Sequence, residues 1–205
     1  MSDFAKKRVL IIAEGYEEKP YIEKIIHFSN ISDVYHFSPV VNAKGAGNLF
    51  ARYQYEMQKG FHDIVLIFCD VDKGSEEFFG IVNKIGNNFF VNPDDALKIF
   101  IFANPVTLQI VLSHFGDVNL TKVSKWKNSE IVKAMTGIDN YDAKEKQIEE
   151  MMNKIHQDSL SDFKMRLNKL SKDINDIPSS NFLTFLERFE NDDVGWIDDI
   201  NNLLK

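Results

Sequence analysis

The sequence predicts an α/β fold: a mostly parallel, Rossmann-like sheet with helices on both faces, followed by a helical appendage. Two observations support this class. Up to residue 116, short continuous apolar runs alternate with amphipathic helical patterns, as in parallel sheets whose strands are buried on both faces. Beyond residue 116 the recognisable patterns are helical. We therefore expect an α/β domain in residues 1–116 and a helical appendage packed on it in residues 117–205.

The expected strands are apolar runs rich in branched side chains. Residues 8–13, RVLIIA, predict a strand buried on both faces, and residues 63–70, DIVLIFCD, predict the central strand. Residues 34–41 contain Pro39, which is typical of an edge strand. A fourth strand is expected at residues 96–103, ALKIFIFA.

A helix is expected after each strand. In the α/β domain the predicted helices lie in residues 17–28, 49–59, 75–85 and 105–115. Pro20 is tolerable because it falls in the first turn of its helix. Asn48 is a candidate N-cap for the second helix, which Gly60 ends. Further helices are expected in the appendage, around residues 131, 148–155, 163–170, 182–189 and 197–204, with no strand among them.

Composition and charge restrict the function classes. The chain carries 24 Lys and Arg against 31 Asp and Glu, a formal charge of −7. A contact with nucleic acid would therefore depend on a local basic patch, on metal ions or on a partner chain. No run approaches the roughly 20 apolar residues of a membrane helix, and the N-terminal region does not fit a secretory signal, so we expect a cytoplasmic protein. The single cysteine, Cys69, excludes an internal disulfide and zinc sites with paired cysteines.

Acidic residues end the two best strands. Glu14 follows the first strand, and Asp70 and Asp72 follow the third. Because parallel strands end at the same edge of a sheet and the second strand is expected at the border, we expect these carboxylates to converge. Such a cluster needs a cation, and carboxylates suit Mg²⁺. The chemistry that follows is phosphoryl transfer or phosphodiester cleavage. The alternative, that Glu14 or Asp72 alone serves as a helix cap, stays open.

These residues resemble a known superfamily. The order IIAEG followed by LIFCDVD is similar to the TOPRIM domain of topoisomerases, primases and OLD nucleases, which has a Glu after the first strand and Asp-x-Asp after the third. The segment EGYEEKPY resembles the opening motif of RloB-like proteins. Four residues of that motif match, namely Glu14, Gly15, Glu18 and Tyr21, whereas Glu17 replaces a Thr.

A second segment, NPVTLQIVLSHF, resembles the Asn-Pro segment of RloB-like proteins. The matching residues are Asn104, Pro105, Leu112, His114 and Phe115. Thr107, Leu108 and Ile110 stand where those proteins usually carry Phe-Glu and a Trp. The third acid of the longer TOPRIM pattern is replaced by Gly74, and Glu76 and Glu77 are the next carboxylates along the chain.

The resemblance implies a function and its site. Glu14 would act as general acid or base, and Glu14, Asp70 and Asp72 would hold Mg²⁺ or, in its place, Mn²⁺. It also implies a phage-defence effector beside an ABC-type ATPase. The chain itself has no Gly-x-x-x-x-Gly-Lys-[Ser/Thr] loop, so we expect the ATPase to be a separate partner chain.

Weaker signals surround this site. Lys73 could contact the scissile phosphate, with simple solvent exposure as the alternative. Backbone amides near Gly15, Gly45 and Gly47, together with Lys44, could bind phosphate, although AKGAGN also fits a plain glycine turn. Additional site candidates are Glu18, Glu76 and His114, where a packed histidine is the alternative for His114. Lys122, Lys125 and Lys127 flank Trp126 as a basic and aromatic cluster.

Three functional hypotheses follow. The first is a Mg²⁺-dependent TOPRIM nuclease acting on DNA or RNA. The second is a receiver-like phosphoacceptor, which also uses acids after these strands, but it calls for an acidic pair at the first strand and a Lys where Asn104 stands. The third is a degenerate TOPRIM module that binds or assembles with a partner. Association into a homo-oligomer is left open.

Overall fold

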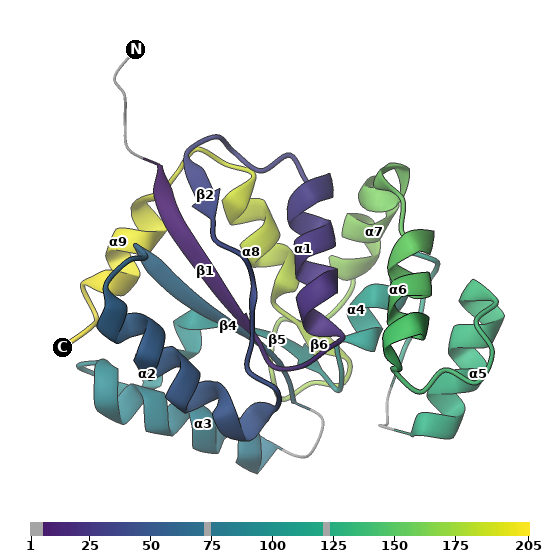
Figure 1. Ribbon diagram of the computed structural model, residues 1–205, viewed down its shortest axis with the longest axis horizontal. Helices are drawn as coiled ribbons and strands as arrows, with labels where there is room; N and C mark the ends of the chain where they lie inside the picture. Colours follow the sequence, from purple (N-terminus) through teal and green to yellow (C-terminus); the bar gives the residue numbers. More distant parts are fainter. Residues whose placement is uncertain (1–5, 72–74, 121–123) are drawn as a thin grey trace.

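One mixed sheet forms the centre of the molecule (Figure 1). The structure, a computed structural model, describes residues 6–71, 75–120 and 124–205. The strands are β1 (Lys7–Ala13), β2 (Tyr35–Phe37), β3 (Val41–Asn42), β4 (Ile64–Asp70), β5 (Phe100–Asn104) and β6 (Ser179–Ser180). Their order is β2-β1-β4-β5-β6, with β3 also paired to β1. All described pairings are parallel except that of β6 with β5. The predicted α/β class with a mostly parallel sheet is therefore confirmed.

Helices lie on both sides of the sheet (Figure 1). The α-helices are α1 (Glu18–Phe28), α2 (Leu49–Lys59), α3 (Ser75–Phe89), α4 (Leu108–Leu112), α5 (Lys125–Thr136), α6 (Glu145–Lys154), α7 (Leu160–Leu167), α8 (Phe182–Phe189) and α9 (Gly195–Asn201). Helices α1 and α8 meet over Ile11 of β1 and Ile101 of β5. On the other side α2 and α3 pack together, with the rings of Tyr53 and Phe89 5.2 Å apart.

The core is centred on β1 and β4, which pair in register from Val9 with Ile64 to Ala13 with Phe68. The side chains of residues 9–13 are at most 2% exposed, as expected for continuous apolar runs covered on both faces. The expected adjacency of these two strands is confirmed. Both strands end at the same edge of the sheet, and the candidate site lies at that edge.

Three expected elements differ in detail. The edge strand expected at residues 34–41 is divided into β2 and β3 on either side of Pro39. The strand expected from residue 96 begins at Phe100, because Pro93–Ile99 forms a 3₁₀ helix, η2, that the side chain of Asn92 caps. The expectation of no strand after residue 116 was wrong at β6, two serines that pair with Ala103 and Asn104.

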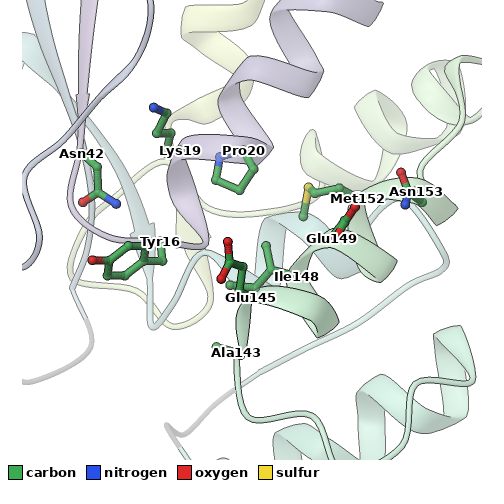
Figure 2. A pocket seen from close by; sticks show the side chains of 10 residues that line it. All are labelled: Tyr16, Lys19, Pro20, Asn42, Ala143, Glu145, Ile148, Glu149, Met152 and Asn153. Atoms are coloured by element: carbon green, nitrogen blue, oxygen red, sulfur yellow. The ribbon is translucent and has the colours of Figure 1, made fainter.

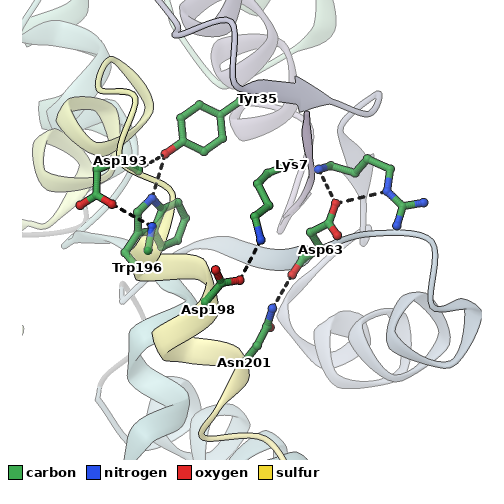
Figure 3. A network of polar contacts seen from close by, with 9 residues as sticks. Lys7, Tyr35, Asp63, Asp193, Trp196, Asp198 and Asn201 are labelled. Carbon is green, nitrogen blue, oxygen red and sulfur yellow. Dashed lines mark hydrogen bonds and ion pairs between the residues drawn. The ribbon is translucent and has the colours of Figure 1, made fainter. Parts of the chain in front are cut away.

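The C-terminal end of the chain packs against the first strands of the sheet, as Figure 3 shows. Lys7 of β1 donates to Asp198 of α9 at 2.7 Å. The indole N–H of Trp196 donates to the hydroxyl of Tyr35 at 3.0 Å, and this hydroxyl donates to the carbonyl of Asp193 at 2.6 Å. Helix α9 and the turn before it are therefore tied to β1 and β2, at the ends of these strands opposite the candidate site.

Candidate functional site

Two acidic residues meet at the carboxyl edge of the sheet. Glu14 directly follows β1, and Asp70 is the last residue of the neighbouring β4. The backbone N–H of Asp70 donates a hydrogen bond to Oε2 of Glu14 at 3.1 Å. The N–H of Glu14 donates to the carbonyl of Phe68 at 2.9 Å. The expected convergence of Glu14 and Asp70 is present, because the parallel pairing of β1 with β4 ends both strands together.

The carboxylate of Asp70 is held by the segment that follows β5. The backbone N–H and the hydroxyl of Thr107 both donate to Oδ1 of Asp70, each at 2.6 Å. Thr107 is fully buried, so this pair of bonds restricts the orientation of the Asp70 side chain. Sequence reasoning noted Thr107 as a departure from the RloB-like pattern and missed its contact with an acid 37 residues away.

A third carboxylate, Glu18, lies in the first turn of α1 and is 6% exposed. Gly15 permits its close approach, because a Cβ at Gly15 would lie 2.8 Å from Oε2 of Glu18. Burial, followed by repulsion from Glu17, raises the pKa of Glu18 to about 7, although hydrogen bonds from backbone N–H groups oppose the rise. Glu18, an additional site candidate from the sequence, thus lies in the carboxylate cluster, and Gly15 packs against it.

The segment before α6 reaches into the same cluster. The hydroxyl of Tyr141, a side chain only 6% exposed, donates to Oε1 of Glu17. Burial raises the pKa of Glu17, and the bond from Tyr141 lowers it in part. Sequence reasoning missed Tyr141, since 124 residues separate it from Glu17 and no pattern links the two.

The cluster concentrates negative charge where water is scarce. Burial and then repulsion from Glu18 raise the pKa of Asp70 well above its usual value, against the hydrogen bond from Thr107. In the described part of the chain, none of the ion pairs includes Glu17, Glu18 or Asp70. Ionising these groups together costs free energy, and a cation placed among them would offset that cost.

The glycine-rich loop proposed for phosphate lies beside Glu14. The N–H of Gly45 donates to the backbone carbonyl of Glu14 at 2.7 Å. The N–H of Lys44 donates to Oδ1 of Asn42 at 2.6 Å. Lys44 and Gly45 both have positive φ, 62° and 116°, and Gly47 lies in the 3₁₀ turn Ala46–Asn48, η1, that leads into α2. The backbone amides of Lys44 and Gly45 are thus occupied within the protein.

The remaining candidates are dispersed. Asp72 and Lys73 fall outside the described residues. Glu76 is exposed in the first turn of α3. His114 is buried, and both ring nitrogens are hydrogen-bonded at 3.1 Å, one to the hydroxyl of Tyr21 and the other to that of Ser159. Burial lowers the pKa of His114 to about 3. It is therefore a packed, neutral histidine, the alternative that the sequence left open.

The donor set at the sheet edge contains oxygen ligands alone. Within residues 6–71, 75–120 and 124–205, no three His, Cys, Asp or Glu side chains form a complete metal-binding group. Asp72, the third expected ligand, is outside these ranges. The two carboxylates of Glu14 and Asp70 fit Mg²⁺, which is commonly bound by one or two carboxylates together with waters and substrate phosphate oxygens.

A pocket of about 710 Å³ opens beside the cluster. Figure 2 shows its two walls. Tyr16, Lys19 and Pro20 belong to the start of α1 and the turn before it, and Asn42 to the end of β3. The facing wall is α6, which contributes residues of mixed character: Glu145, Ile148, Glu149, Met152 and Asn153. Only Gly15 separates Tyr16 from Glu14 along the chain, so the pocket lies close to the carboxylate cluster.

Comparisons with known proteins give no family for this chain. No protein-family profile matches it, and neither a curated protein nor a solved structure matches it. Of the helices that the structure describes, none combines the length and apolarity that crossing a membrane requires.

Proposed function

We propose that this chain is a Mg²⁺-dependent nuclease of the TOPRIM type that cleaves phosphodiester bonds in DNA or RNA. The observation that carries the proposal is the contact of Glu14 with Asp70 at the ends of adjacent parallel strands, 3.1 Å from carboxylate oxygen to backbone nitrogen. This edge is where open α/β sheets bind their ligands. When bound, the metal would polarise the phosphate and lower the pKa of a coordinated water.

The residues of the chain take separate roles in this proposal. Asp70 would hold the ion, and the two hydrogen bonds from Thr107 fix the orientation of its carboxylate. Glu14 would hold the ion from the neighbouring strand and, as the family resemblance implies, would act as general acid or base. The raised pKa of Asp70 supports the assignment, because clusters of buried, mutually repelling acids are more common at functional sites than elsewhere.

A cleavage assay on DNA, RNA and transfer RNA tests the proposal. We expect cleavage in Mg²⁺ or Mn²⁺, none in EDTA, and a loss of at least about 100-fold in Asp70→Asn. Asp63→Asn is the matched control, because Asp63 precedes the same strand at its opposite end and binds Arg8 instead. Equal cleavage by the wild type and Asp70→Asn would remove Asp70 from the mechanism.

The same preparation separates the alternatives. A receiver-like module would form an acyl phosphate on Asp70 when treated with a small phosphodonor. A degenerate binding module would neither cleave nor bind Mg²⁺ at millimolar concentration. Copurification of a larger ATPase with the tagged chain would support the proposed partner, with or without cleavage activity.

A further inference from the structure

The pocket between α1 and α6 combines an exposed aromatic ring, two buried apolar side chains and two carboxylates. One wall carries Tyr16, whose side chain is 69% exposed although it is a large aromatic residue. Ile148 and Met152 provide a buried apolar floor, at 4% and 6% exposure. Glu145 and Glu149 are exposed on the facing wall, one helical turn apart on α6. An aromatic face, an apolar floor and hydrogen-bond acceptors suit a nucleobase.

The two walls are held in fixed positions before any ligand enters. The bond from Tyr141 to Glu17 ties the segment before α6 to the turn before α1. The side chain of Gln147 donates to the backbone carbonyls of Asp139 and Asn140, at 3.2 and 2.9 Å, which fixes the start of α6. A site formed in advance needs less ordering when its ligand binds.

Charge determines which part of a nucleotide enters. Glu145 and Glu149 repel phosphate but accept hydrogen bonds from exocyclic amino groups, as carboxylates do with the cytosine amine. Lys19 is the basic residue among those lining the pocket. Its ion pair with Glu23, at 3.8 Å, is exposed and weak, so Lys19 can turn to a phosphate. A base placed between the walls would therefore leave its phosphate on the side of α1.

We propose that this pocket binds a nucleobase carrying an exocyclic amine, next to the scissile phosphate of a single-stranded substrate, with Tyr16 as the stacking platform. The inference rests on the proposed nuclease function and adds base selection to it. Tyr16 lies two residues beyond Glu14, a span of at most about 7 Å of chain. A phosphate held at Glu14 and Asp70 therefore has its neighbouring base within reach of Tyr16.

Binding of labelled single strands tests the inference. Fluorescence anisotropy is measured with eight-nucleotide oligo(dA), oligo(dC) and oligo(dT) in Ca²⁺, which takes the same oxygen ligands as Mg²⁺. We expect weaker binding of oligo(dT), because thymine lacks the exocyclic amine. Tyr16→Ala should weaken all three strands at least about five-fold, and Tyr16→Phe should retain wild-type affinity. Glu145→Ala combined with Glu149→Ala should bring the three affinities within about two-fold of one another.

The outcomes separate this inference from the proposed function. If the wild type neither binds nor cleaves any strand, the nuclease proposal fails and the pocket assignment fails with it. If the wild type cleaves while Tyr16→Ala leaves Kd and KM unchanged, the pocket assignment alone fails. If free AMP binds as tightly as the strands, the pocket is a mononucleotide site and its assignment to a substrate strand is wrong.

Discussion

Replacing Glu18 with glutamine should stabilise the metal-free protein at alkaline pH. Glu18 is 6% exposed and its pKa is raised from 4.5 to about 7, chiefly by burial. A carboxyl group whose pKa is raised in the folded state lowers stability once the pH exceeds its pKa in the unfolded state. The full penalty is reached when the pH exceeds its pKa in the folded state. At about 1.4 kcal/mol per pH unit, the penalty at pH 8.5 is about 3 kcal/mol. Glutamine retains the shape and an acceptor oxygen without the charge.

Urea unfolding in EDTA measures this gain. We expect Glu18→Gln to exceed the wild type by up to about 3 kcal/mol at pH 8.5, and the difference to shrink as the pH falls from 7 to 4.5. Glu23→Gln is the matched control on the same helix, since Glu23 is exposed and should change stability by less than about 0.5 kcal/mol. A Glu18→Gln variant no more stable than the wild type at pH 8.5 would refute the assigned cost of this charge.

Three further changes test buried contacts at the site and elsewhere in the core. His114→Gln should remove the acid sensitivity that this histidine gives the protein. Because its pKa is lowered to about 3, the wild type loses up to about 1.4 kcal/mol of stability per pH unit below 6.5. If the unfolding free energies of variant and wild type, measured in urea, fall equally between pH 6.5 and 4.5, this reasoning is wrong. Thr107→Val should cost about 1 to 2 kcal/mol in the same assay, because Asp70 loses a hydroxyl donor, and an unchanged midpoint would show that bond to be unimportant. Gly86→Ala should destabilise by about 3 kcal/mol or more, because its Cβ would lie 2.2 Å from a backbone carbonyl of η2. Gly80→Ala in the same helix meets no atom within 4 Å and should be neutral or stabilising in thermal unfolding; equal effects of the two would be inconsistent with this packing.

The sequence was sufficient for the central strands and the acids that end them. Residues 9–13 of β1 and 64–69 of β4 are continuous apolar runs, so the burial, adjacency and common edge of the two strands follow from the pattern alone. The same pattern therefore predicts that Glu14 and Asp70 lie together. The short strand β6 could not be found in this way, since two serines show neither apolar alternation nor branched side chains.

The parts of the site that were missed depend on contacts between distant segments. Thr107 reaches Asp70 from the segment after β5, and Tyr141 reaches Glu17 from the segment before α6. Neither residue carries a spacing or a motif that marks it. The beginning of β5 was misplaced because Ala96 and Ile99 are as apolar as strand residues. They belong instead to a 3₁₀ helix that buries both side chains.

The most direct test of the central claim is a Mg²⁺ titration of the wild type, Asp70→Asn and Asp63→Asn. Binding is measured by calorimetry, and Tm is measured at each Mg²⁺ concentration. The wild type and Asp63→Asn should bind one equivalent of Mg²⁺ and show a Tm that rises with its concentration, because a ligand that binds the folded state stabilises it. Asp70→Asn should show no heat and no rise in Tm. The same heat and the same rise in all three proteins would contradict the claim that Glu14 and Asp70 form a cation site.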